Sequence, residues 1–147
     1  VIGATIRIVK GGPHLRGVVV EEGDSKTVVR TFQHLSTVGA EPEEQLNDLA
    51  QAVASEMKAQ EVRAAVVRET SYFAKAGLDA GLKHRLRAEG VTLHVMRTST
   101  PLVLVGDIVK LRARLGLTAD EFKQAGVDLK AGDWAEAASA ALVACTL

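Results

Sequence analysis

Three carboxylates hold positions from which they could form most of an acidic metal site. Glu69 follows an apolar, strand-like run, and Asp133 and Glu136 stand three residues apart, so a helix would place them on one face. Carboxylate oxygens suit hard divalent cations such as Mg²⁺. The first twenty residues contain no Asp or Glu, and Lys10 stands directly before a Gly11-Gly12-Pro13 turn. The amino-terminal region can therefore add no carboxylate to such a site.

The elements that would position these carboxylates change along the chain from strands to helices. Three early segments have the alternating or β-branched pattern of strands, and short links between them favour an antiparallel meander: Ala4–Val9, Leu15–Val20 and Thr27–Phe32. Residues 41–61 then place apolar side chains from Leu46 to Met57 at helical spacing. Arg63–Val67 has the composition of a buried strand.

The second half of the chain predicts further helices and a fifth strand. Leu78, Leu82 and Leu86 repeat every four residues and predict a helix that ends at Gly90, and Val91–Met96 is predicted as the fifth strand. An apolar stretch follows Pro101, then a basic helical segment at 107–116, a capped turn from Leu117, and a last helix that runs from Trp134 to Cys145. This order predicts an α/β domain over residues 1–147, with helices packed on a mixed sheet.

Two stretches of the sequence resemble a known family. From Val67 to His94 the chain has a glutamate at the end of the fourth strand, an aromatic-Ala-Lys step, and a helix that leads through a glycine into the next strand. Residues 132–141 carry two acids three residues apart in an alanine-rich frame. With the order of elements, these features resemble RuvC-like Holliday junction resolvases. The resemblance implies a ribonuclease H-like fold, a mixed five-stranded sheet of three antiparallel and then parallel strands, with helices on both faces.

The resemblance also implies roles for the acids. In that family four carboxylates hold two divalent ions, which clamp the attacking water and the leaving oxygen of a phosphodiester. Glu69 would correspond to the ligand after the fourth strand, and Asp133 and Glu136 to the last two ligands. The first-strand aspartate has no counterpart, because Lys10 stands at the matching place. The implied site is therefore degenerate, and these three acids would bind Mg²⁺ or Mn²⁺ only if the domain is active.

The ammonium group of Lys10 could supply the positive charge that a metal ion would otherwise give the three acids. An aspartate-to-lysine difference changes the local charge by two units and opposes cation entry. We therefore expect the Lys10 ammonium to lie among Glu69, Asp133 and Glu136 as an internal counter-ion, since grouped carboxylates without a cation repel one another or take up protons. A simpler interpretation makes Glu69 a surface residue that pairs with Arg68 or Lys75. Asp133 and Glu136 would then be first-turn charges that favour the helix dipole.

Positive charge gathers in the middle of the chain. Between Arg63 and Arg114 there are ten Lys or Arg against four Asp or Glu, although the whole chain has no net charge. Part of this excess could form a surface that contacts nucleic-acid phosphates beside the acids: Lys75, Lys83, Arg85, Arg87, Lys110, Arg112 and Arg114. The alternative is a solvated helix face that pairs with the acidic first helix.

Composition limits the setting in which the chain works. The single cysteine, Cys145, cannot form an internal disulfide and lies in an apolar context, which favours a reducing compartment. No apolar run approaches the roughly 18 residues of a membrane-spanning helix, and no basic-then-apolar leader is present. We therefore expect a cytoplasmic protein without a membrane partner.

Three functions remain open from the sequence. The first is a pseudo-nuclease that has lost metal-dependent cleavage, uses no cofactor, and binds branched or duplex nucleic acid or a protein partner. The second is an active metal-dependent endonuclease that resolves branched DNA and tolerates Lys10. The third is a purely structural subunit of an oligomer. The resemblance implies a homodimer, because members of the family often form dimers. Salt dependence distinguishes nucleic-acid binding from a structural subunit, because phosphate binding weakens as salt rises, whereas an apolar interface hardly responds.

Overall fold

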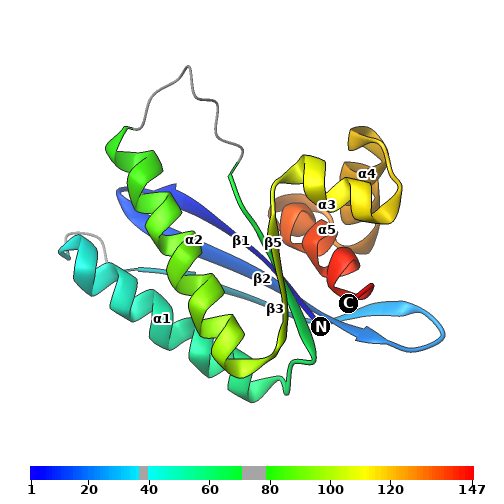
Figure 1. The fold of residues 1–147 in the computed structure, drawn as a ribbon, viewed down its shortest axis with the longest axis horizontal. Helices are drawn as coiled ribbons and strands as arrows, with labels where there is room; N and C mark the ends of the chain where they lie inside the picture. The colour runs from blue at the N-terminus through cyan, green and yellow to red at the C-terminus, as the bar shows by residue number, and fades with distance from the viewer. Residues whose placement is uncertain (37–39, 71–78) are drawn as a thin grey trace.

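Five strands form one sheet in the order β3-β2-β1-β4-β5 (Figure 1). The computed structural model describes residues 1–36, 40–70 and 79–147. The strands are β1 (Ile2–Val9), β2 (Gly12–Glu22), β3 (Lys26–Leu35), β4 (Ala64–Arg68) and β5 (Leu102–Gly106). The first three are antiparallel neighbours, and β4 and β5 run parallel to β1. The expected mixed five-stranded sheet is confirmed.

Helices cover both faces of this sheet (Figure 1). One face carries α1 (Pro42–Ala59) and α2 (Ala80–Ser99). The other carries α3 (Ile108–Leu115), α4 (Ala119–Leu129), the 3₁₀ turn η2 (Gly132–Trp134) and α5 (Ala135–Ala144). Asp107 caps α3, and Thr118 forms with Glu121 the capping box of α4, so the capped turn predicted from Leu117 is confirmed.

The predicted strand at Val91–Met96 is wrong. These residues continue α2, which passes through Gly90, and the fifth strand is the later apolar stretch Leu102–Gly106. Ala88, Thr92 and Met96 are buried at four-residue spacing along the helix. Burial of that face outweighs the roughly 1 kcal/mol by which a helical glycine is less favourable than alanine. Of the predicted leucine repeat, Leu78 lies outside the described residues, and Leu86 is exposed.

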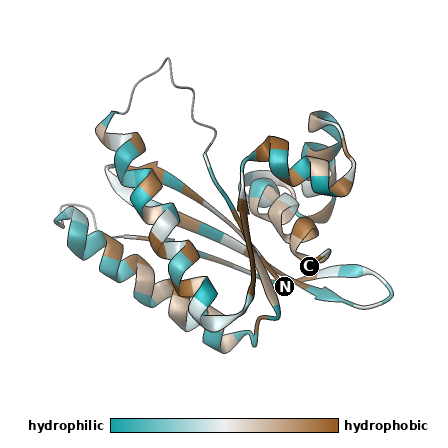
Figure 2. Cartoon of the chain, viewed as in Figure 1, coloured by the Kyte–Doolittle hydropathy of each residue, from teal (hydrophilic) through white to brown (hydrophobic). Residues whose placement is uncertain are grey.

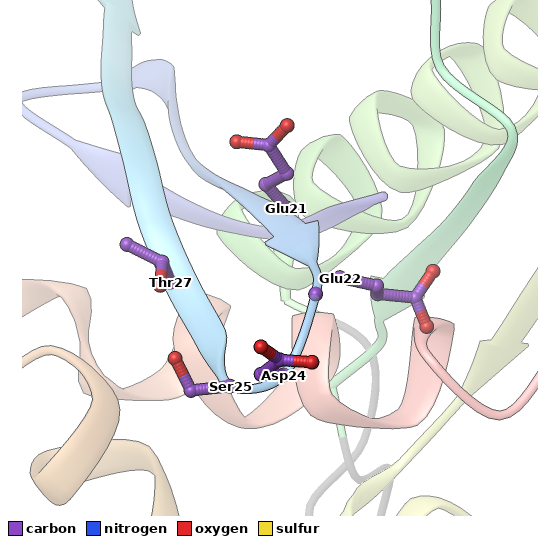
Figure 3. A pocket seen from close by; sticks show the side chains of 6 residues that line it. Glu21, Glu22, Asp24, Ser25 and Thr27 are labelled. Carbon is purple, nitrogen blue, oxygen red and sulfur yellow. The ribbon is translucent and has the colours of Figure 1, made fainter.

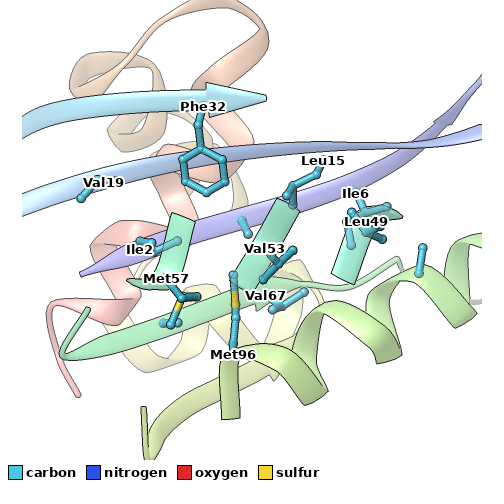
Figure 4. Close-up of a cluster of buried hydrophobic side chains, with 13 residues drawn as sticks. Ile2, Ile6, Leu15, Val19, Phe32, Leu49, Val53, Met57, Val67 and Met96 are labelled. Carbon is cyan, nitrogen blue, oxygen red and sulfur yellow. The ribbon is translucent and has the colours of Figure 1, made fainter. Parts of the chain in front are cut away.

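Alternation along β1 divides its side chains between the two helical layers. Ile2, Ala4 and Ile6 are buried in the core between the sheet and the layer of α1 and α2, which Figure 4 shows together with Leu49 and other core side chains. Gly3 faces the other way, against α5, where an added Cβ would lie 2.1 Å from the carbonyl oxygen of Ala137. The helix therefore packs directly on the backbone of β1, and the next side chains on that face, Thr5 and Arg7, point toward the start of α5.

Hydropathy follows the same layers. Figure 2 shows β5 as almost wholly hydrophobic, whereas α1 and α2 carry many hydrophilic residues. Beneath α3, α4 and α5 lies a second core, in which Leu111 and Phe122 are fully buried. In the described part of the chain, no helix is both long enough and apolar enough to cross a membrane.

Candidate functional site

The candidate site lies at the carboxyl ends of β1 and β4. In the parallel pairing of these strands Thr5 stands opposite Arg68, so the residues that follow Thr5 in β1 lie level with Glu69. The amide of Glu69 donates a hydrogen bond of 3.0 Å to the carbonyl oxygen of Gly106, which fixes the exit from β4 against β5. Next to this point is a polar pocket of about 260 Å³, lined by Arg7, Arg68, Glu69, Thr70, Arg85 and Glu136.

Two arginines from the sheet hold Glu136, which lies in the first turn of α5. Its Oε2 is 2.9 Å from Nη2 of Arg7, and its Oε1 is 3.4 Å from Nη1 of Arg68. Burial by itself would raise the pKa of Glu136, but the neighbouring Arg68 and Arg7 outweigh burial, and the pKa lies below its ordinary value. The carboxylate is therefore charged at neutral pH and bridges β1 and β4 to the start of α5.

Asp133 belongs to a separate ion pair. It lies in η2 rather than in α5, and its Oδ2 is 2.9 Å from Nη2 of Arg16 in β2. Its carbonyl oxygen accepts a second hydrogen bond, of 3.1 Å, from the same guanidinium. The Asp133 side chain is 73% exposed, and the residue does not line the pocket. The expectation that Asp133 and Glu136 share one face of a single helix is thus wrong, because the helix begins only at Ala135.

Beneath the pocket a buried carboxylate organises the third arginine. Glu89 of α2 is only 5% exposed, and its Oε1 accepts hydrogen bonds of 3.0 Å from Nε of Arg85 and from the amide of Thr70. Burial raises the pKa of Glu89, although Arg85 opposes that shift. Glu89 therefore links α2 to the segment after β4 and fixes the position of the Arg85 guanidinium at the pocket.

The structure does not bring Lys10 to the acids. Lys10 and Gly11 form the two-residue turn between β1 and β2, with φ of 50° and 82°, which is typical of tight hairpins. Lys10 is exposed and lies three residues beyond Arg7, about 10 Å of extended strand. Among the described residues no hydrogen bond or ion pair joins it to Glu69, Asp133 or Glu136. Arg7 and Arg68 take the counter-ion position that was expected for Lys10.

The predicted basic surface is divided in the structure. Arg85 faces the pocket, whereas Lys83 and Arg87 are exposed and lie about 200° around α2 from it. Lys110 donates to the carbonyl oxygen of Val105 at 2.7 Å, close to the carboxyl end of β5. Arg112 and Arg114 contact Leu117 and Thr146 at the other end of α3. Lys75 lies outside the described residues.

Four features near the site were not predicted from the sequence: Arg7, Arg16, the pairing of Arg68 with Glu136, and Glu89. Two signals could have found them. The first twenty residues hold three Lys or Arg and no acid. This excess of positive charge indicates that basic side chains of the first two strands need acidic partners elsewhere in the chain. Arg85 and Glu89 stand at i and i+4 on a helix, a spacing that brings side chains together.

Carboxylates gather instead at the opposite end of the sheet. The tip of the hairpin between β2 and β3 forms a pocket lined by Glu21, Glu22 and Asp24 among others, and Figure 3 shows these carboxylates pointing in different directions. One of them, Glu22, is paired with Arg63. Within residues 1–36, 40–70 and 79–147 no group of three His, Cys, Asp or Glu side chains could hold a metal ion. Acidic side chains therefore gather at the hairpin tip, whereas arginines paired with acids line the pocket at the other end of the sheet.

Comparison with known proteins shows the fold. No family model matches the chain, and no curated protein matches it. A structure of Thermus thermophilus RuvC is similar over 97% of this chain and 92% of that chain, with a TM-score of 0.65 and 14% identity. T. thermophilus RuvC in complex with a Holliday junction substrate is similar over 97% and 89%, with a TM-score of 0.70 and 15% identity. The chain has a ribonuclease H-like fold like that of RuvC.

Proposed function

We propose that this chain is a ribonuclease H-fold domain that binds structured nucleic acid without metal-dependent cleavage. The observation that carries the proposal is the ion pairing of Glu136 with Arg7 and Arg68 at the carboxyl ends of β1 and β4. The cations at this site are guanidinium groups of the chain itself. A divalent ion that approached Glu136 would meet two positive charges within 4 Å of the same carboxylate, and would have to displace both.

The distribution of basic side chains supports phosphate as the partner. Arg7 is 50% exposed beside the pocket, and Lys10 is exposed at the adjoining hairpin turn. Arginine presents five N–H donors, which suit the oxygens of a phosphate group. The acidic hairpin tip at the far end of the sheet would repel the same backbone. A polyanion would therefore be drawn to the end of the sheet that carries the arginines.

A four-way DNA junction is the first ligand to test, because one structure of similar fold is RuvC bound to a Holliday junction substrate. Binding of a fluorescent junction is measured by anisotropy in EDTA and in Mg²⁺, over a series of salt concentrations. We expect Mg²⁺ not to strengthen binding, and an affinity that falls linearly on logarithmic axes as monovalent salt rises.

Two variants make this experiment specific. Arg7→Gln should weaken junction binding and reduce the salt slope by about one. Arg63→Gln is the matched control, because Arg63 is also 50% exposed and paired with a glutamate, but lies at the acidic end of the sheet. Equal losses in both variants would show non-specific attraction and contradict the proposed interface.

The same junction tests the nuclease alternative. Incubation with Mg²⁺ or Mn²⁺ should leave the junction intact. Cleavage by the native chain that is lost in Glu69→Gln would overturn the proposal in favour of an active endonuclease. Absence of junction binding at low salt, with a salt-insensitive self-association, would instead favour a structural subunit.

A further inference from the structure

The pocket beside Glu136 holds an unusual concentration of guanidinium groups. Arg7, Arg68 and Arg85 come from β1, β4 and α2, and all three line the same 260 Å³ of space. At roughly 30 Å³ for each water molecule, that volume is equivalent to about nine waters, which is ample for a phosphate group with part of its hydration. Three arginines from separate elements thus converge on a space of suitable size.

Within residues 1–36, 40–70 and 79–147, these guanidinium groups use few of their five N–H donors. Arg7 and Arg68 each contact Glu136 through one terminal nitrogen, and Arg85 contacts Glu89 through Nε. Burial lowers the pKa of Arg68, and the nearby Arg7 and Arg85 lower it further, although Glu136 opposes them. The positive charges therefore repel one another across the pocket, while Glu136 attracts Arg68.

An anion must nevertheless compete with the carboxylates of the chain. Glu69 and Glu136 line the pocket, and Glu89 lies beneath it, so three acids balance the three arginines. The Glu136 carboxylate already bridges two guanidinium groups, an arrangement that two oxygens of a phosphate can reproduce. Glu136 is thus placed as the internal competitor of an incoming phosphate.

We infer that this pocket is a phosphate-binding site, in which one phosphodiester group of bound nucleic acid replaces Glu136 as the partner of Arg7 and Arg68 and gains Arg85 as a third donor. The inference rests on the proposed function, because it assigns the phosphate to a nucleic-acid backbone. A phosphate site and a metal site predict opposite effects of Glu136 on ligand affinity. Loss of the Glu136 charge should strengthen phosphate binding, whereas the same change would weaken binding of a cation.

The test is a titration with inorganic phosphate at constant ionic strength, followed through the arginine side-chain N–H signals in NMR spectra. We expect the signals of Arg7, Arg68 and Arg85 to shift together and to saturate. Glu136→Gln should lower the Kd by about fivefold, and Arg7→Gln should raise it by a similar factor. Arg7 is half exposed, so its variant should remain folded, which the backbone amide spectrum checks.

Glu56→Gln serves as the matched control. Glu56 is a partly exposed glutamate that also binds a guanidinium, that of Arg30, but it lies on α1 away from the pocket. Its loss should leave the phosphate Kd unchanged. The inference is overturned if phosphate shifts Arg30 as much as the pocket arginines, if the shifts do not saturate, or if Glu136→Gln weakens binding.

Junction binding separates this inference from the proposed function. If the junction binds but phosphate does not shift the three arginines, the pocket inference fails and the proposed function stands. If phosphate binds with the expected signs but the junction does not bind, the pocket is confirmed as a phosphate site and the nucleic-acid function fails.

Discussion

The ion pairs of Glu136 lead to a quantitative prediction about stability. Glu136→Gln removes the charge that joins Arg7 and Arg68 to α5 but keeps the size of the side chain and an oxygen acceptor. The Glu136 side chain is 32% exposed and that of Arg68 is 18% exposed, so the site lies between a surface pair and a buried one. Surface pairs contribute about 0.2–1 kcal/mol, and loss of one partner of a buried pair costs about 3–5 kcal/mol. We expect Glu136→Gln to lower the free energy of unfolding at pH 7 by about 1–2 kcal/mol.

The effect should depend on pH in a defined direction. The pKa of Glu136 in the folded protein lies below its ordinary value of 4.5. A lowered pKa means that the ion pairs stabilise the fold fully at pH values above the unfolded pKa, and that this contribution is lost as the pH falls through the folded pKa. The difference between the native chain and Glu136→Gln should therefore be constant from neutral pH down to about pH 6, and it should be lost as the pH falls through the lowered pKa of Glu136 in the folded protein.

Urea unfolding followed by circular dichroism measures this difference at each pH. Asp133→Asn is the matched comparison, because it removes the same charge three residues earlier from a side chain that is 73% exposed. Its cost should stay below about 1 kcal/mol. A Glu136→Gln effect that does not change with pH, or an equal cost for Asp133→Asn, would refute the assignment of Glu136 as the bridge between the sheet and α5.

Three further changes test other parts of the structure. Gly3→Ala should lower the free energy of unfolding in urea by about 1–3 kcal/mol, because the added Cβ would meet the backbone of α5. Gly90→Ala should instead raise it by up to about 1 kcal/mol, because alanine favours a helix more than glycine does. A destabilised Gly90→Ala variant would contradict the continuous helix α2, since Gly90 is exposed and an added Cβ meets no atom within 4 Å. Arg7→Asp should create a Mn²⁺ affinity, measurable by calorimetry, that Lys10→Asp does not, because Arg7 contacts Glu136 and Lys10 lies about 10 Å farther along the chain. Equal Mn²⁺ binding in both variants would contradict the placement of the ligand position at Arg7.

Local pattern was sufficient for most of the elements but not for the fifth strand. Thr118 and Glu121, spaced as a capping box, begin α4 as expected, and the apolar repeat from Leu46 to Met57 lies within α1. Val91–Met96 has strand-like composition, yet it is helical because Thr92 and Met96 complete a buried helical face. Whether an apolar stretch forms a strand or a helix depends on which face finds a partner, and that is a tertiary property.

The sequence by itself determined that no carboxylate stands in β1 and that Glu69 follows a buried strand, because residue types and the ends of apolar runs are local facts. Only the tertiary structure decided which cation meets the acids. The parallel register of β1 and β4 places Arg7 at the pocket, and the tight turn holds Lys10 beyond it. Pairing across strands is set by register and by the packing of Gly3 against α5, so residues 129 positions apart in the chain, Arg7 and Glu136, become one ion pair.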